Sequence, residues 1–146
     1  MSKLTVCLNQ CLANTFEMYQ RAHGMHWNVE GINFPLYHDF FGTIYEEIYG
    51  SIDQFAEEIR ACGDYAIFGT KAFSMTNQLP QCDCTDMTDV KSMLQSLLEC
   101  NTVVVNCLNS CFSLAEADNC QGLMDFLASR LDAHAKHGWQ IASCLK

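Results

Sequence analysis

Two histidines and two carboxylates in the first half of the chain have the chemistry of a metal site. They are His26, in the run HWNVEG, followed by His38, Asp53 and Glu57. A redox-active divalent metal such as iron readily accepts imidazole and carboxylate ligands. Asp53 and Glu57 are four residues apart, so on a helix their side chains lie on one face. By itself, this acidic pair also fits an ordinary solvated helix face.

The elements that must position these residues are helices. Hydrophobic residues recur at helical spacing along nearly the whole sequence, which has neither strand-like alternation nor a glycine-rich phosphate loop. Four long helices, two short links and one long crossover, with a short helix between the second and third long helices, indicate an all-α, ferritin-like four-helix bundle. We expect a single domain over residues 1–146. The expected segments are 4–31, 33–63, a short helix at 68–74, a helix that begins at 86–89 and a last helix after 118–119.

The composition is both acidic and apolar. The 146 residues include 8 Lys and Arg against 17 Asp and Glu, a net charge of −9, and 49% are hydrophobic. An acidic chain without a basic tail repels DNA and anionic membranes but attracts cations, so we do not expect DNA binding. The sequence has no run of about 18 apolar residues, so we expect no membrane span. Its N-terminus lacks a secretory hydrophobic region, which predicts a cytoplasmic protein.

The sequence contains an unusual number of cysteines, 10 in all. Cys7 and Cys11 are four residues apart, as are Cys107 and Cys111, so each pair shares a helix face. We expect most cysteines to be small buried hydrophobic residues, as free cysteines often are. The CDC motif at 82–84 could instead be reactive or bind a metal, but the sequence offers no second motif to complete a zinc site.

The spacing of the four candidate ligands suggests how the molecule assembles. His26 and His38 lie on either side of the first turn between helices, whereas Asp53 is about 20 residues, or roughly 30 Å, into the second helix. One helical hairpin therefore keeps the histidines and the acids apart. If two copies crossed antiparallel near Tyr45–Glu46, His38 of one copy would lie opposite Asp53 of the other, giving two equivalent sites.

The stretch from His23 to Arg60 resembles the Dps family (DNA-binding proteins from starved cells, or mini-ferritins). The family motif has one histidine in HWNVxG, a second twelve residues later in LxH[DE]FF, and DxxxE in the same helix. This chain has HWNVEG, LYHDFF and DQFAE at the corresponding positions. The likeness continues through FGT at 68–70 and RLDAHAKHGW at 130–139, so it covers essentially the whole chain.

This resemblance implies a ferroxidase and an iron store. The family forms a hollow dodecamer, built from dimers, that oxidises Fe(II) with hydrogen peroxide in preference to O2 and stores the ferric mineral. By this resemblance, His26 and His38 would bind iron from one subunit, and Asp53 and Glu57 from its dimer partner. Trp27 would lie beside the iron, where it could intercept stray radicals, although a helix-interface aromatic explains it equally well.

Some positions depart from the family pattern or have a second explanation. Gly42 stands where the family usually has an acid that helps to hold a second metal, so we expect a single tight iron site. Ala135 replaces a common glutamate, with less obvious consequence. His23 fits the family pattern HxxH as a supporting or surface residue. We expect His134 and His137 to be structural, because the Glu-x-x-His motifs of bundle di-iron sites are absent from the sequence.

These observations predict a cytoplasmic mini-ferritin that protects its host from peroxide combined with iron. Glu116, Asp118 and Asp125 fall where the family lines its three-fold pores, although a preference for acids near helix N-termini explains them nearly as well. The alternatives are a non-catalytic ferritin-like shell or DNA-protecting scaffold with a degraded iron site, and a thiol-based redox role for the cysteines.

Overall fold

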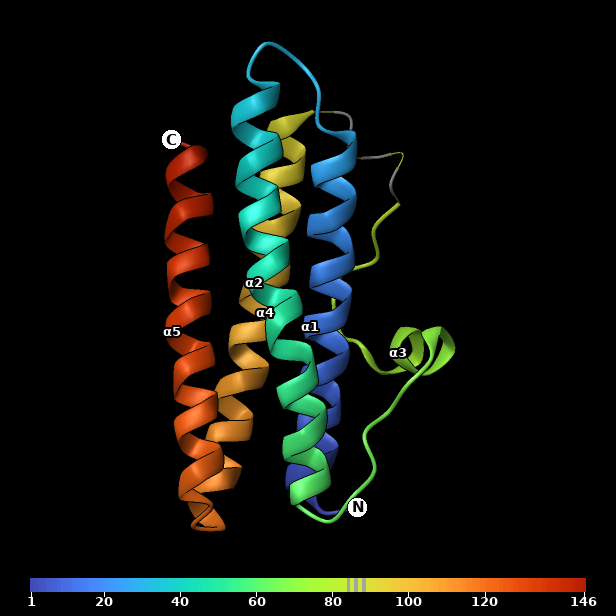
Figure 1. Ribbon diagram of the computed structural model, residues 1–146, viewed down its shortest axis with the longest axis vertical. Coiled ribbons are helices and arrows are strands. Elements are labelled where there is room, and N and C mark those ends of the chain that lie inside the picture. Colours follow the sequence, from blue (N-terminus) through green and yellow to red (C-terminus); the bar gives the residue numbers. More distant parts are fainter. Residues whose placement is uncertain (84, 86, 88) are drawn as a thin grey trace.

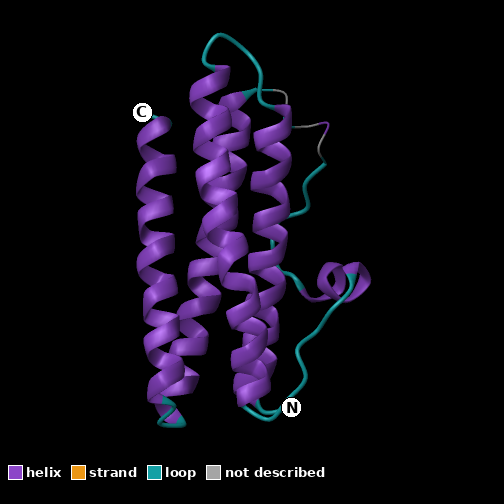
Figure 2. Cartoon of the chain, viewed as in Figure 1, coloured by secondary structure: helices purple, strands orange, loops and turns teal. Residues whose placement is uncertain are grey.

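The computed structural model of the chain describes every residue except 84, 86 and 88. Within this part of the chain, all regular structure is helical and no strand occurs (Figure 2). The predicted all-α fold is therefore confirmed. The helices are α1 (Lys3–Asn28), α2 (Phe34–Ala61), α3 (Thr70–Thr76), α4 (Val90–Ala117) and α5 (Gln121–Cys144).

The four long helices run side by side as a bundle with the predicted connections (Figure 1). Short turns at 29–33 and 118–120 join α1 to α2 and α4 to α5. The described parts of segment 62–89 pass along the bundle from the end of α2 to the start of α4 and carry α3 on the outside, against α1. As a result, α2 and α4 run in the same direction and α1 runs opposite to both.

Short-range hydrogen bonds define where two of the helices begin. The Ser2 hydroxyl accepts the backbone N–H of Thr5 at the start of α1, and the Asp89 carboxylate accepts that of Ser92 at the start of α4. Each bond satisfies an N–H that has no partner inside the helix. Pro35 occupies the first turn of α2, where its missing N–H leaves no helical hydrogen bond unmade.

The core consists of one apolar stripe from each long helix. The Phe55 ring of α2 is fully buried and meets Phe126 of α5 edge-on, with ring centroids 4.8 Å apart. Leu36, in the first turn of α2, is 65% exposed although its spacing predicts a core position. It lies at the end of the bundle, where fewer helices surround it. The largest fully buried side chains also include Leu8, Leu12, Met18, Met25, Phe41, Ile44, Ile48, Ile59, Leu94, Leu97 and Leu108.

Buried asparagines of α1 hold the crossover against the bundle. Asn9 donates from Nδ2 to the Tyr65 carbonyl oxygen (3.2 Å), and its Oδ1 accepts the Ile67 N–H (2.9 Å). Asn14 accepts the Gln78 N–H through Oδ1 (2.7 Å). Because these bonds pair the buried amides of Asn9 and Asn14 with backbone groups of the crossover, they fix its path beside α1.

Among the described helices, α4 alone is long and apolar enough, by length and composition, to cross a membrane. Its apolarity has a simpler explanation in this fold. Leu97, Val104 and Leu108 are fully buried, and α4 packs against both α1 and α5. We therefore assign α4 to the bundle core.

The burial of Phe55 leads to a stability prediction. We expect Phe55→Ala to lower the free energy of unfolding by about 3–5 kcal/mol, because it removes a buried ring and leaves a cavity. Phe68→Ala is the matched control, since Phe68 is 87% exposed. Its effect should stay within about 0.5 kcal/mol. Urea unfolding followed by circular dichroism measures both, and equal losses would contradict the assigned core.

Candidate metal centre

The two candidate histidines meet across the first helical hairpin. His26 lies in the last turn of α1 and His38 near the start of α2, and their rings stack with centroids 3.7 Å apart. His26 Nδ1 donates to the backbone carbonyl oxygen of His38 (2.7 Å), and His38 Nδ1 donates to that of His26 (2.8 Å). Because a carbonyl oxygen only accepts, each Nδ1 carries the hydrogen and each Nε2 keeps a free lone pair. The backbone thus fixes both rings in the tautomer that can bind a metal through Nε2.

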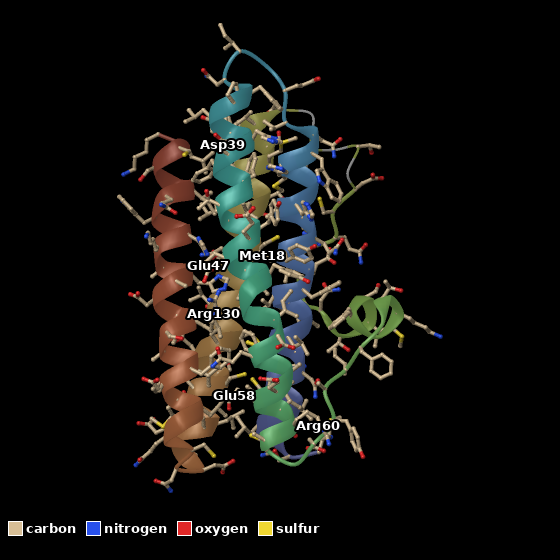
Figure 3. All side chains as sticks on the ribbon, in the orientation of Figure 1. Met18, Asp39, Glu47, Glu58, Arg60 and Arg130 are labelled. Atoms are coloured by element: carbon tan, nitrogen blue, oxygen red, sulfur yellow. The ribbon has the colours of Figure 1, made fainter. Side chains whose placement is uncertain are left out.

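The candidate carboxylates lie on the other half of α2. Asp53 and Glu57 are both exposed and one helical turn apart. Asp53 is 15 residues beyond His38, a separation of about 22 Å along a helix. In Figure 3, Asp39 and Glu58, which follow His38 and Glu57 in the sequence, lie toward opposite ends of α2. One chain therefore pairs the histidines and pairs the carboxylates, but it does not bring the two pairs together.

The two pairs nevertheless share one side of α2. At about 100° per residue, Asp53 lies only about 60° around the helix from His38. Tyr45 and Tyr49 lie between them on the same side, and Tyr49 is 60% exposed. An exposed aromatic surface of this kind is typical of a protein interface. A second antiparallel α2 laid on it would bring each histidine pair opposite a carboxylate pair.

Aromatic rings surround the histidine pair on one side. Trp27 is 63% exposed and packs on His23, with centroids 4.2 Å apart. His23 stacks in turn on Tyr45 at 4.0 Å, and its Nδ1 lies 3.3 Å from the Tyr19 hydroxyl. Partial burial and then the neighbouring His26 lower the pKa of His23, which favours a neutral ring. Trp27 is thus a surface aromatic and not part of the core. It reaches the histidine pair through His23.

Gly42 lies directly against a candidate ligand. A Cβ built at this position would be 3.2 Å from His26 Nδ1, closer than most real Cβ contacts. The His26 ring cannot easily move away, because its Nδ1 is hydrogen-bonded to the His38 carbonyl. The position of His26 is therefore linked to the lack of a side chain at residue 42.

A second polar cluster, which the sequence did not reveal, lies between α2 and α5 near Glu47 and Arg130 (Figure 3). Arg130 donates to both oxygens of Glu47 through its two terminal nitrogens, and His137 Nε2 donates to Glu47 Oε2 (2.7 Å). Burial alone would raise the pKa of Glu47, but the hydrogen bonds from His137 and Arg130 hold it well below its usual range. Because a guanidinium already neutralises Glu47, this cluster does not suit a metal cation.

His134 extends this cluster into the core, where it is fully buried. Its Nδ1 donates to Asn101 Oδ1 (2.8 Å), while Asn101 Nδ2 donates back to the His134 carbonyl oxygen (3.0 Å). Burial, and then the charge of Arg130, lower the pKa of His134 to about 3. Its ring is therefore neutral and structural at neutral pH, in line with the role expected from the sequence.

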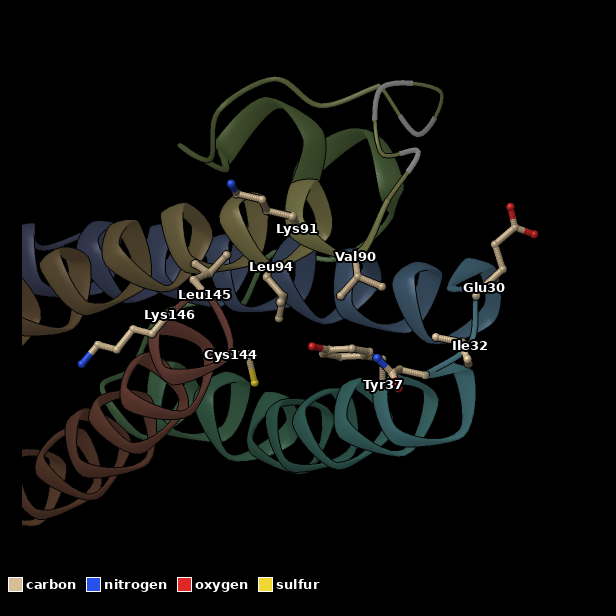
Figure 4. Close-up of a pocket in the computed structure, with 11 residues that line it drawn as sticks. Glu30, Ile32, Tyr37, Val90, Lys91, Leu94, Cys144, Leu145 and Lys146 are labelled. Carbon is tan, nitrogen blue, oxygen red and sulfur yellow. The ribbon is translucent and has the colours of Figure 1, made fainter.

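A pocket of about 410 Å³ opens between the α1–α2 turn, the start of α4 and the end of α5 (Figure 4). Tyr37, Leu94 and Cys144 are among the residues that line it. None of the four candidate metal ligands belongs to its lining. The pocket is thus separate from the candidate metal centre.

The remaining candidate residues lie at the surface. Glu116, Asp118 and Asp125 are exposed around the turn from α4 to α5. Cys82 is exposed in the crossover, and Cys84 lies outside the described residues. The acids form an exposed negative region that could attract cations.

Comparison with known proteins gives a consistent result. Residues 7–146 match the family model of the ferritin-like domain. The DNA protection during starvation protein of Brevibacillus brevis is 27% identical over 146 residues, covering 98% of this chain and 95% of that protein. The crystal structure of a Dps protein from Bacillus brevis is 26% identical with a TM-score of 0.91, covering 100% of both chains. A DPS protein from Vibrio cholerae O1, described as a member of a broad superfamily of ferritin-like diiron-carboxylate proteins, is 25% identical with a TM-score of 0.91, covering 99% and 89%.

The buried His134 predicts how stability depends on pH. Its pKa is about 3 when folded, against an ordinary value of 6.5, so between these values the unfolded chain binds the additional proton. The free energy of unfolding should therefore fall as the pH is lowered from 6.5 toward 3, by up to about 1.4 kcal/mol per pH unit from this group. Glu47, whose pKa is also depressed, acts in the same direction below about pH 4.5.

Urea unfolding at several pH values measures this slope. His134→Gln keeps an N–H that can donate to Asn101 but does not titrate, so the slope between pH 6.5 and 5 should become shallower. Lys136→Gln, at an exposed position of α5, is the control and should leave the slope unchanged. An unchanged slope in His134→Gln would show that His134 is not the group responsible.

Proposed function

Because the chain belongs to the ferritin-like domain family, with Dps proteins as its relatives, we propose that it is a mini-ferritin. It oxidises Fe(II), preferably with hydrogen peroxide, and stores the ferric product inside a hollow shell. One observation carries this proposal: the reciprocal hydrogen bonds of His26 and His38 leave both Nε2 atoms free for a metal. A structural histidine pair would have no need of two free acceptors at the surface.

The iron site is completed by a second subunit. Two subunits related by a two-fold axis near Tyr45–Glu46 place Asp53 and Glu57 of one opposite the histidines of the other. The exposed Tyr49 is buried in this contact, and each dimer has two equivalent sites. Imidazole and carboxylate ligands bind Fe(II) without employing thiolates, which peroxide would oxidise.

Iron is the substrate: the protein side chains bind Fe(II), and hydrogen peroxide oxidises it. Each hydrogen peroxide molecule accepts one electron from each of two Fe(II) ions. It also takes up two protons, so the products are two Fe(III) ions and two water molecules. Electrons delivered in pairs reduce peroxide completely and release no hydroxyl radical. Trp27 is an oxidisable ring next to the site and would scavenge radicals that escape this pairing.

Gly42 sets the expected number of tight iron sites. A carboxylate at this position would help to hold a second metal, but the packing of His26 against Gly42 leaves no room for a side chain without a shift of the ring. We therefore assign one tight Fe(II) site to each subunit. A second iron needed for the two-electron step would be bound weakly or supplied by the neighbouring site.

The proposed assembly is a cytoplasmic dodecamer built from dimers. The cytoplasm keeps thiols reduced, which suits a chain with 10 cysteines. Glu116, Asp118 and Asp125 would line entry pores and draw Fe(II) inward. The net charge of −9 disfavours direct binding to DNA, so protection would come from the removal of iron and peroxide.

We expect Asp53→Asn/Glu57→Gln to abolish the tight site. Anaerobic titration should show one tight Fe(II) per subunit in the native protein and none in the variant. Peroxide-driven oxidation should slow by more than about 100-fold, since two ligands are lost. Glu99→Gln/Asp132→Asn removes the same charge at exposed positions and should oxidise iron at the native rate. Equal, slow oxidation in all three proteins would favour a non-catalytic shell.

Mixed dimers test whether two subunits share the site. Subunits with His26→Ala/His38→Ala and subunits with Asp53→Asn/Glu57→Gln should each be inactive alone. When the two are unfolded and refolded together, half of the randomly formed dimers contain both kinds and have one intact site of two. About one quarter of the native oxidation rate should then return. A mixture as inactive as its components would show that each site is formed within one subunit.

A further inference from the structure

Four cysteine thiols meet in the bundle core between α1 and α4. Each helix contributes two cysteines that are one turn apart, and all four are buried. We call this set the core thiol cluster; it consists of Cys7, Cys11, Cys107 and Cys111. The sequence shows the two pairs, but only the packing of α1 against α4 places the pairs opposite each other.

Three of the sulfur atoms of the cluster are close enough to share one ligand. Cys7 Sγ lies 2.7 Å from Cys111 Sγ. The Sγ atoms of Cys7, Cys107 and Cys111 all lie within 4.8 Å of one another. Cys11 interacts with both Cys107 and Cys111. Two or three thiolates bound to one metal at about 2.3 Å are about 4.0 to 4.6 Å apart.

The pKa values of the thiols in the core thiol cluster are shifted in opposite directions. The hydrogen bond with Cys107 raises the pKa of Cys7 to about 12. Hydrogen bonds from Cys11, then Cys111 and Cys7, lower the pKa of Cys107. Cys107 is therefore the thiol that ionises first, stabilised by its three neighbours. A bare second thiolate would be strongly disfavoured, and only a bound cation could stabilise it.

We propose that the core thiol cluster binds one soft metal ion, Cu(I), independently of the iron site. Thiolates select soft ions, which favours Cu(I) over Fe(II). Charge favours Cu(I) over Zn(II): two thiolates satisfy Cu(I) and leave a charge of −1, whereas a four-thiolate zinc site leaves a charge of −2 in an apolar core. Cys7 lies 19 residues before His26 on α1, about 28 Å along the helix, so copper here would be remote from the histidine pair of the same chain.

The first experiment uses the native chain, in which some thiols are exposed and those of the core thiol cluster are buried. Cys62, Cys82 and Cys144 are exposed, whereas the core thiol cluster is buried. Iodoacetamide applied anaerobically to the folded, reduced protein should therefore block the exposed thiols and spare the cluster, which peptide mass spectrometry verifies. The blocked protein is then titrated with Cu(I) against bathocuproine disulfonate, a competing Cu(I) chelator.

We expect the blocked protein to retain one Cu(I) per chain, with only sulfur neighbours in its X-ray absorption spectrum. Loss of Cu(I) binding after blocking, or nitrogen or oxygen neighbours, would overturn the proposal. So would a disulfide between Cys7 and Cys111 that persists in the reduced protein. Zn(II) that displaced Cu(I) at equal concentration would overturn the assignment to copper.

Matched variants locate the bound ion. Cys107→Ala/Cys111→Ala removes the α4 half of the cluster and should weaken Cu(I) binding by more than about 100-fold. Cys62→Ala/Cys144→Ala removes two exposed thiols and should leave the affinity unchanged. Equal affinities in the two variants would contradict the proposal. Because the blocked native chain is tested separately, the proposal can fail even if the core variant does not fold.

Discussion

The fixed rise of an α-helix determines what this chain can do alone. His38 and Asp53 share one side of α2, but about 1.5 Å per residue separates them by about 22 Å. No side-chain rotamer spans that distance, and α2 continues without a break from Phe34 to Ala61. The donor set is therefore either divided between two molecules or without function. The exposed Tyr49 between the two half-sites favours the first possibility, because an isolated chain would leave an aromatic surface in water.

The histidine pair shows how backbone groups prepare a side chain for metal binding. The carbonyl groups of His26 and His38 lie near the helix ends that flank the first turn, and each accepts a ring N–H. One pair of hydrogen bonds thus sets the tautomers, holds the rings in contact and joins α1 to α2. The same bonds restrict the His26 ring to the space beside Gly42. A chain with an acid at this position would need a different ring placement, so in the proposed site the number of iron ions is coupled to the hairpin packing.

The sequence predicts the helices well and singles out the candidate ligands, because both depend on local spacing; that these residues bind a metal stays a prediction. Side chains that contact residues on another helix are harder to predict from the sequence. Glu47 is adjacent to the core position of Ile48 and looks like a surface acid until Arg130 of α5 is placed opposite it. Asn9 and Asn14 interrupt the apolar stripe of α1, a signal that polar groups there have buried partners. Such contacts depend on the relative rotation and register of packed helices, which periodicity alone does not define.

The ligand chemistry also explains where the thiols lie. A centre that consumes peroxide needs ligands that resist oxidation, and imidazole and carboxylate meet this need at an exposed position. Thiolates bind soft metals more strongly but oxidise when peroxide reaches them. In this fold the clustered cysteines between α1 and α4 are buried, and the distance along α1 separates them from the histidine pair. Burial raises the cost of an uncompensated thiolate, and the pKa values of Cys7, Cys11 and Cys111 are all raised, so in the absence of a soft cation these three thiols stay protonated. The same core packing can therefore both protect the thiols from peroxide and keep them available for a soft metal ion other than iron.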